Sequence, residues 1–321
     1  MAVLKLHMTY GCTAACAHCR FWCERAPGTV IEETLALRAV RELNAALGLD
    51  LVVLMGGEPG MSLDLTQRLT DAIAGQGIGV RIETNAFWAT DLDAARSWLA
   101  PFVRRNAEIM LSLDAFHEPF VPPENVAHAL HAAADLGGHC VVEMAYLERP
   151  GADNPYDRRS DALLAMVRGK LNGQPVVPNY QGTVFFNGRA SAMLSGHVSR
   201  GRGVPRETCL AVPWWAAGEY DTFDLLILDP DGYLSKGCGI ALGNVRDCTV
   251  ETVLGAFDAD THPIFATLRK TGPFGLAQEA RELGYVLKPD YADKCHLCQE
   301  ARTILRERYP EWLTPAQHYA P

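Results

Sequence analysis

The sequence predicts an α/β fold in which six parallel strands alternate with helices to form a partial (β/α)6 barrel, followed by a small C-terminal domain of one hairpin and several helices. Two observations predict the barrel. Short apolar runs alternate six times with segments of helical periodicity between residues 1 and 190, a rhythm typical of parallel sheets. Glycine or polar residues follow these runs, as they do where the carboxyl ends of parallel strands carry functional groups.

The expected strands are short and mostly apolar. Polar and apolar side chains alternate in the first, and the second is apolar throughout, as in a strand that is buried on both faces. The third strand ends at Thr84-Asn85, the fourth ends at Asp114, and the sixth ends at Gly188. We expect these strands over residues 3–9, 51–55, 79–83, 108–113, 139–147 and 182–187.

Five helices are expected between the strands. The first carries an apolar stripe that Gly48 ends, and Asp91 caps the third. Pro122 and Pro123 open the fourth, which stops at Gly137. These helices are expected over residues 31–47, 63–74, 91–99, 122–136 and 161–171.

The last third of the chain has a different organisation. The segment Asp229-Pro230-Asp231-Gly232 lies between two apolar runs and predicts a hairpin of strands 223–228 and 233–236. Helices are expected to follow over 250–257, 263–269 and 299–308. We therefore expect a barrel over residues 1–190, a linker or active-site cover over 191–208, and a second domain over 209–321.

Composition and charge exclude two classes of partner. The 321 residues are 48% hydrophobic and 21% charged, and the formal net charge is −9. An acidic chain of this kind is not expected to bind nucleic acid or an anionic membrane surface. No apolar run reaches the length of a membrane span, and residues 1–9 lack the features of a signal peptide. We expect a cytoplasmic protein.

Three cysteines with the spacing C-x-x-x-C-x-x-C follow the first strand: Cys12, Cys16 and Cys19. Thiolates favour iron–sulfur clusters or zinc over hard cations. Only three cysteines are supplied, which leaves one iron of a cubic cluster open to another molecule. A zinc site in which Cys23 or His18 provides the fourth ligand is the alternative.

This spacing resembles the cluster loop of the radical S-adenosylmethionine (SAM) superfamily, and the resemblance extends over roughly residues 1–190. It implies that Cys12, Cys16 and Cys19 hold a [4Fe-4S] cluster whose open iron binds SAM. It also implies a Gly-Gly-Glu motif for the SAM amino group, strand-end groups for the ribose and methionyl parts, and an arginine for the carboxylate. The implied cofactor-binding residues are His18, Gly56, Gly57, Glu58, Pro59, Thr84, Asn85, Ser112, Asp114, Glu143 and Arg189.

Four later cysteines, namely Cys209, Cys238 and the pair Cys295 and Cys298, flank or follow the hairpin. Their arrangement resembles the auxiliary-cluster domains called Twitch and SPASM, and implies a second [4Fe-4S] cluster that accepts an electron or braces the C-terminus. Cys248 is an alternative to Cys209 as a ligand. By ligand type alone, a structural zinc ion is an alternative to the cluster.

The resemblance implies an enzyme that cleaves SAM reductively to a 5′-deoxyadenosyl radical, which abstracts a hydrogen atom from a substrate. We expect a peptide substrate that is crosslinked, epimerised or oxidised, and an external electron donor such as flavodoxin or ferredoxin. A small-molecule dehydrogenase or epimerase is the alternative, and a non-catalytic iron–sulfur carrier or redox sensor is a third reading.

Epimerisation requires a second hydrogen donor, for which a thiol is suited. The cysteines left over from the two clusters are the candidates: Cys23, Cys140 and Cys248. A buried cysteine is more often a small core residue. Phe116, His117 and Glu118 follow the fourth strand and are expected to line the substrate pocket.

Overall fold

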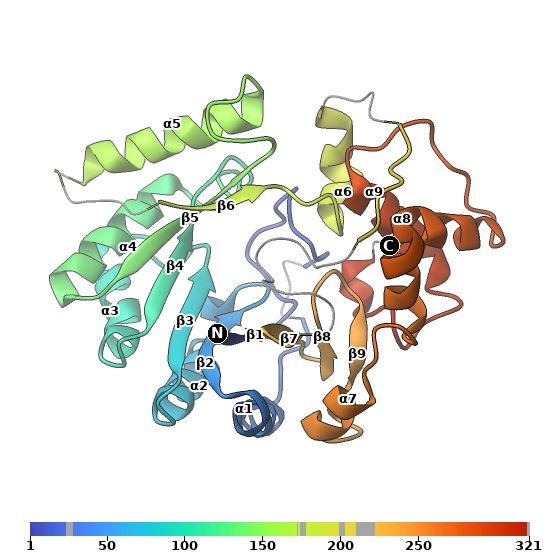
Figure 1. Cartoon of the computed structure of the whole chain (residues 1–321). Coiled ribbons are helices and arrows are strands. Elements are labelled where there is room, and N and C mark those ends of the chain that lie inside the picture. The colour runs from blue at the N-terminus through green and yellow to red at the C-terminus, as the bar shows by residue number, and fades with distance from the viewer. Residues whose placement is uncertain (24–27, 172, 174–177, 199–202, 210–221, 320–321) are drawn as a thin grey trace.

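The computed structural model describes residues 1–23, 28–171, 173, 178–198, 203–209 and 222–319. One nine-stranded sheet runs through these residues in the order β6-β5-β4-β3-β2-β1-β7-β8-β9. Figure 1 shows the sheet curling around the centre of the molecule. Its strands are β1 (Ala2–His7), β2 (Leu49–Met55), β3 (Gly79–Thr84), β4 (Glu108–Ser112), β5 (Cys140–Tyr146), β6 (Pro178–Thr183), β7 (Leu225–Leu228), β8 (Tyr233–Ser235) and β9 (Ala241–Asn244).

The first six strands are parallel neighbours in chain order, which confirms the predicted α/β fold with an open, partial barrel. β2 shows why the apolar runs form this sheet. Val52, Val53 and Leu54 are all buried, because helices cover one face of a parallel sheet and the barrel interior covers the other.

The expected hairpin forms, and it extends the same sheet. β7 pairs in parallel with β1, with Val3 opposite Leu225. β8 and β9 then continue in antiparallel order. The last third of the chain is therefore joined to the first strand, through hydrogen bonds between β7 and β1.

Helices α1 to α5 lie on the outer side of the curled sheet, and α8 and α9 lie beyond its C-terminal end (Figure 1). In α1 the predicted stripe, including Leu35, Ala39 and Leu43, is buried, and Gly48 ends the helix with a φ of 67°. The helices are α1 (Glu33–Leu47), α2 (Leu63–Ala74), α3 (Leu92–Val103), α4 (Pro123–Leu136), α5 (Pro155–Lys170), α6 (Arg189–Leu194), α7 (Val250–Ala256), α8 (Pro263–Arg281) and α9 (Lys294–Leu305), with short 3-10 turns at Pro59–Ser62, Ser195–His197 and Ala316–His318.

Two predictions in the barrel were displaced. Helix α5 begins at Pro155 rather than at residue 161, because the Asn154 side chain caps it by accepting from the Asp157 N–H at 2.9 Å. Strand β6 ends at Thr183, whereas a strand was expected over 182–187. The apolar residues Val184 and Phe186 are buried in a small second core instead, so their hydrophobicity reflects packing outside the sheet.

The C-terminal third also differs from expectation. Helix α9 begins at Lys294, five residues early, because Asp293 accepts from the His296 N–H at 2.8 Å. Helix α8 extends to Arg281 through a break at Gly272, where φ is 66°. Neither α6 nor β9 was expected. Residues 199–202 of the expected linker lie outside the described residues.

Among the helices of the described residues, none combines the length and the apolar character needed to cross a membrane.

Candidate functional site

A cavity of about 370 Å³ lies where the parallel strands end. The rule that strand ends carry the functional groups predicts which residues meet there. Most of the predicted cluster and SAM residues line this cavity: Cys12, Cys16, His18, Cys19, Gly56, Gly57, Glu58, Thr84, Asn85, Ser112, Asp114 and Glu143.

The cysteine loop follows β1 and turns its thiols inward. Cys12 and Cys16 are 8% and 5% exposed, and burial raises the pKa of Cys12 well above its usual value. The Ala14 N–H points at the Cys12 sulfur at 3.4 Å, and the Phe21 N–H points at the Cys19 sulfur at 3.4 Å. Backbone donors of this kind stabilise negative charge on sulfur, as a metal-bound thiolate requires.

The spacing of the thiols tests which metal group they fit. Sulfurs around one tetrahedral zinc ion would lie about 3.8 Å apart. Within the described part of the chain, a single group of three or more Cys, His, Asp or Glu has all its ligand atoms within 4.8 Å of one another, and that group is Cys16, His18 and His117. Cys12, Cys16 and Cys19 are therefore spread more widely than a zinc site needs. They fit a larger group, such as an iron–sulfur cluster.

The Gly-Gly-Glu segment after β2 packs against the cysteine loop. The Gly57 N–H donates to the Thr9 carbonyl at 2.6 Å, and the Glu58 N–H donates to the Gly11 carbonyl at 2.8 Å. A Cβ on Gly57 would lie 1.8 Å from the Gly11 carbonyl oxygen. Only glycine fits at residue 57, so the motif fixes the cysteine loop as well as lining the cavity.

Glu58 joins this segment to the end of β3. Its Oε1 accepts from the Thr84 hydroxyl at 2.7 Å and from the Gly60 N–H at 2.8 Å, and its Oε2 accepts from the Asn85 N–H at 2.9 Å. Glu58 is 1% exposed, and burial raises its pKa. A carboxylate offers about four acceptor positions, so three are used within the protein.

Thr84 and Asn85 differ in their freedom to bind a ligand. The Thr84 hydroxyl also accepts from the Ala86 N–H and the Trp88 indole N–H, so this side chain is fully used. The Asn85 side chain donates one of its two amide hydrogens to the Thr13 hydroxyl at 3.0 Å, which ties β3 to the cysteine loop. The second amide hydrogen can serve a ligand.

Asp114 is held in the same way. One oxygen accepts from the N–H groups of Phe116 and His117 and from the His117 ring at 2.9 Å, and the other accepts from the Ala145 N–H at 3.3 Å. Although burial opposes it, the pKa of this carboxyl is lowered by His117 and by His18. Asp114 therefore orients His117, which lines the cavity.

Several predicted site residues lie elsewhere. Pro59 and Arg189 do not line the cavity as the described residues define it. The Arg189 guanidinium instead donates to the Cys23 carbonyl at 3.0 Å and lies over the Trp22 ring. Of the expected substrate-pocket residues, Phe116 is a buried core residue and Glu118 pairs with Arg159 on the surface.

The three candidate hydrogen donors are also separated. Cys23 lines the cavity and is 5% exposed. Cys140 is the first residue of β5 and lies at the opposite end of that strand from the cavity rim. Cys248 donates to the Asn244 carbonyl near β9. Cys140 and Cys248 therefore do not line the cavity, whereas Cys23 does.

Charged side chains that sequence reasoning missed line the inner wall of the cavity. Lys5 on β1 pairs with Glu83 on β3 at 2.9 Å, and Arg81 on β3 pairs with Glu108 on β4. Burial, with a contribution from Glu83, raises the pKa of Glu143 to about 7. The spacing of Arg81 and Glu83 was the available signal, because residues two apart on a strand face the same side.

The later cysteines meet in a second, small cavity. Cys209, Cys238, Cys295 and Cys298 all line it, whereas Cys248 does not. Arg302, which is 1% exposed, donates to the Cys298 sulfur at 3.2 Å and to the Tyr319 hydroxyl at 2.7 Å. It also donates to the Cys238 carbonyl.

The turn that carries Cys238 has an unusual backbone. Gly237, Cys238 and Gly239 all have positive φ values of 91°, 60° and 69°, which a cysteine rarely adopts. A Cβ on Gly239 would lie 2.4 Å from the His318 ring. The glycines therefore let the turn close against the C-terminal segment and present the Cys238 thiol to the other three.

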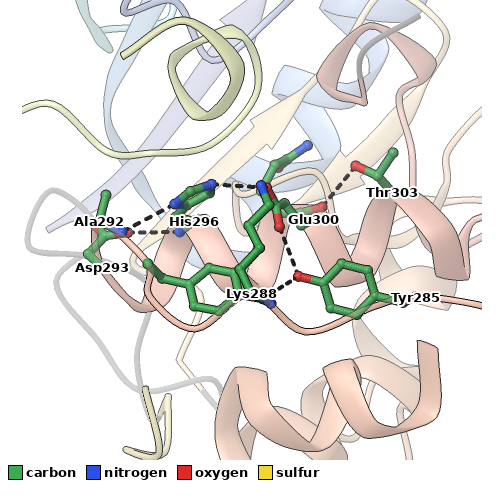
Figure 2. Close-up of polar contacts among 9 residues, drawn as sticks. Tyr285, Lys288, Ala292, Asp293, His296, Glu300 and Thr303 are labelled. Carbon is green, nitrogen blue, oxygen red and sulfur yellow. Dashed lines mark hydrogen bonds and ion pairs between the residues drawn. The ribbon is translucent and has the colours of Figure 1, made fainter. Parts of the chain in front are cut away.

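Figure 2 shows the polar network that fixes the start of α9, where Cys295 and Cys298 lie. The Ala292 N–H donates to one ring nitrogen of His296 at 3.2 Å, and the other ring nitrogen contacts Glu300 at 3.0 Å. Glu300 also accepts from the Tyr285 hydroxyl at 2.8 Å and from Lys288. The preceding loop is thereby pinned to the first turns of the helix.

Comparisons with known proteins bear on the first cavity. Residues 6–149 match the radical SAM superfamily, and no curated protein sequence matches the chain significantly. SuiB of Streptococcus suis bound to its precursor peptide SuiA has a similar fold, with a TM-score of 0.53 at 15% identity over 84% of this chain and 66% of SuiB. SuiB bound to SAM gives 0.51 at 13% identity over 84% and 67%. The chain thus spans about two thirds of the length of SuiB.

A further similar structure is anSMEcpe with bound SAM, with a TM-score of 0.49 at 14% identity over 96% of this chain and 97% of that one.

Proposed function

Residues 6–149 of this chain match the radical SAM superfamily. On this premise we propose that the protein is an enzyme that cleaves SAM reductively and takes a hydrogen atom from a peptide substrate. One observation carries the proposal. Three widely spaced thiols and the polar groups at the ends of β2, β3 and β4 line the same cavity. A non-catalytic iron–sulfur carrier would not need the polar groups.

In this proposal Cys12, Cys16 and Cys19 hold a [4Fe-4S] cluster. When bound, the cluster supplies the electron that breaks a carbon–sulfur bond of SAM, and the fragment so formed removes the substrate hydrogen. The protein binds, orients and shields these groups. We further propose that an external donor such as flavodoxin or ferredoxin reduces the cluster.

The SAM-binding residues that we propose are those that line the cavity and keep polar capacity. Gly56 and Gly57 offer backbone groups, and Glu58 keeps one acceptor position for an ammonium group. Asn85 and Ser112 complete the set. Thr84 and Asp114 act through the residues they hold in place. Arg189 donates to the Cys23 carbonyl and is not part of the proposed SAM site.

The inner wall favours a polar substrate. Lys5, Arg81, Glu83 and Glu143 surround the deeper part of the cavity, and an apolar group there would remove solvent from these polar side chains without offering them a hydrogen bond. A peptide takes support from SuiB, a protein of the same fold whose structure contains a precursor peptide. A small polar molecule is the alternative substrate.

We also propose that Cys209, Cys238, Cys295 and Cys298 hold an auxiliary [4Fe-4S] cluster. Their convergence on one small cavity supports this assignment, as does their absence from the compact ligand groups found among the described residues. Two cubic clusters would give about eight irons per chain. Fewer than about seven in fully reconstituted protein would contradict the second cluster.

Cys23 is the thiol that we propose as a hydrogen donor if the product is epimerised, because it lines the cavity. The Cys23→Ala variant should still form 5′-deoxyadenosine but should no longer invert the substrate centre. Cys140→Ala and Cys248→Ala are matched controls, since both thiols lie outside the cavity. Unchanged stereochemistry in Cys23→Ala would remove this assignment.

The enzymatic proposal is tested by anaerobic incubation of the reconstituted protein with SAM and dithionite. We expect 5′-deoxyadenosine to form, and we expect Cys16→Ala to abolish it while Cys140→Ala does not. Protein that carries the N-terminal cluster but yields no 5′-deoxyadenosine would instead be a carrier or sensor. The substrate can then be sought by mass spectrometry of candidate peptides before and after incubation.

A further inference from the structure

A compact group of metal-binding side chains lies at one side of the main cavity. Ligand atoms of Cys16, His18 and His117 all lie within 4.8 Å of one another. All three residues line the cavity. Thiolate sulfur and imidazole nitrogen both bind zinc, and three protein ligands leave a fourth position for water.

His117 is oriented as a metal-binding histidine usually is. Its Nδ1 contacts the Asp114 carboxylate at 2.9 Å, and that carboxylate also accepts from the backbone N–H of His117 at 3.0 Å. A ligating histidine normally donates its second ring N–H to a carboxylate or carbonyl, which fixes the ring and its tautomer. Nε2 is the nitrogen left to face the group.

His18 supplies a second, independent observation. Its Nδ1 is buried and has no hydrogen-bond partner within the described residues. Its ring packs 4.8 Å from the Phe116 ring and 5.0 Å from the His117 ring, measured between centroids. A buried ring nitrogen without a partner costs stability unless another group binds it.

We propose that Cys16, His18 and His117 bind one zinc ion when the N-terminal iron–sulfur cluster is absent. Binding displaces the Cys16 thiol proton and the His117 Nε2 proton to solvent, and leaves the thiolate and two neutral imidazoles on the metal. Asp114 acts as a positioning residue for His117. Because Cys16 is shared, the zinc ion and the proposed cluster exclude each other; only this competition rests on the proposed function.

The proposal changes how a metal analysis is interpreted. Zinc in protein purified in air would not show that the three cysteines form a zinc knuckle. It would instead be expected at a site that uses one of those cysteines and two histidines. Iron–sulfur loading should then require zinc to leave Cys16.

Two variants of the full-length chain separate the two sites. Cys12→Ala/Cys19→Ala cannot build the proposed cluster but retains all three zinc ligands. His18→Ala/His117→Ala loses two zinc ligands but retains all three cysteines. His131→Ala is a control, since that ring is exposed and bonds to the Lys170 carbonyl.

Zinc per chain is measured after equilibrium dialysis of cluster-free protein against buffered Zn²⁺, and Co²⁺ serves as the spectroscopic probe of thiolate ligation. We expect Cys12→Ala/Cys19→Ala and His131→Ala to match the unaltered chain. We expect His18→Ala/His117→Ala to bind one zinc ion fewer, although it still assembles the N-terminal cluster on reconstitution. Asp114→Asn should weaken zinc binding at this site by about tenfold or more.

Equal zinc content in His18→Ala/His117→Ala and the unaltered chain would overturn the proposal, as would loss of this zinc ion in Cys12→Ala/Cys19→Ala. If the double histidine variant does not fold, His18→Ala decides alone, because the His18 Nδ1 has no hydrogen bond to any described residue that the substitution could remove. Failure of the unaltered chain to assemble an N-terminal cluster would contradict the proposed function without affecting the zinc result.

Discussion

Gly57 lies so close to Gly11 that a Cβ on Gly57 would stand 1.8 Å from the Gly11 carbonyl oxygen. The neighbouring Glu58 N–H donates to that same oxygen at 2.8 Å. The segment after β2 is therefore the surface against which the cysteine loop takes its shape. Close packing requires glycine at residues 56 and 57 of this segment, whether or not a ligand is bound.

Gly57→Ala should displace the cysteine loop. The added methyl group overlaps backbone atoms that cannot move without breaking the two hydrogen bonds, so we expect destabilisation by about 1 to 3 kcal/mol or more. We also expect loss of N-terminal iron. Gly169→Ala is the control, because a Cβ at that position in α5 would meet no atom of the described residues within 4 Å. This variant should gain up to about 1 kcal/mol of stability. Chemical denaturation and iron analysis give both readouts, and normal iron loading in Gly57→Ala would contradict the packing argument.

Glu58→Gln should weaken the connection between the loop after β2 and the end of β3. An amide cannot accept at both ends, so one of the three donors to Glu58 loses its acceptor. We expect a loss of about 1.5 to 3 kcal/mol and weaker SAM binding. Glu33→Gln, which affects an exposed pair with Arg68, should change stability by less than about 1 kcal/mol. Urea melts and SAM titrations of both variants provide the comparison.

The sequence was sufficient to predict the cavity rim because the information is local. Each apolar run predicts a strand, and the parallel order places all strand ends at one edge. Glu58, Asn85 and Ser112 were found in this way without knowledge of any contact. Strand β6 lies earlier in the chain than predicted, because Val184 and Phe186 are buried in a second core and not in the sheet.

Other features depend on tertiary contacts that no local pattern reveals. Lys5 reaches Glu83 across the whole width of β2, and this pairing exists only once the sheet order is known. Arg302 in α9 resembles a surface arginine in the sequence but is buried against Cys298 and Tyr319. The pairing of β7 with β1 is likewise invisible, since more than 200 residues separate Val3 from Leu225.

Arg302→Met should affect the C-terminal cysteines selectively. It removes the guanidinium that contacts the Cys298 sulfur, and it leaves the Cys238 carbonyl and the Tyr319 hydroxyl without their donor. We expect destabilisation by about 2 to 4 kcal/mol and a fall from about eight to about four irons per chain. Arg308→Met is the control, because among the described residues it breaks pairs with Glu279 and Glu282 and touches none of the four cysteines. Full iron content in Arg302→Met would show that the guanidinium does not support the site.

Glu300→Gln should loosen the loop before α9. Glu300 collects the Tyr285 hydroxyl, Lys288 and the His296 ring (Figure 2). The neutral amide accepts fewer bonds and loses the charge that Lys288 pairs with, so we expect about 1 to 2 kcal/mol of destabilisation. Amide hydrogen exchange should accelerate in the loop and in the first turn of α9, while α1 keeps its protection. Unchanged exchange around Cys295 would contradict a role for the network in holding that turn.

Asp229 should make stability depend on pH in a direction opposite to that of most carboxyl groups. It is 3% exposed, and burial, with a contribution from Asp231, raises its pKa from 3.8 to about 7. Between these two values the unfolded chain has lost the proton and the folded chain keeps it. Folding stability from this group is therefore full below about pH 4 and falls by about 1.4 kcal/mol per pH unit until about pH 7.

Asp229→Asn removes this dependence, and an amide oxygen can still accept from the Asp231 and Tyr233 N–H groups that Asp229 now binds at 2.9 Å. Relative to the unaltered chain, the variant should gain stability steadily between pH 5 and pH 7 and then hold that gain at pH 8. Urea melts of both proteins at equal metal content measure the difference. Parallel stability curves over this range would mean that the Asp229 carboxyl ionises in the folded protein as easily as it does in the unfolded chain.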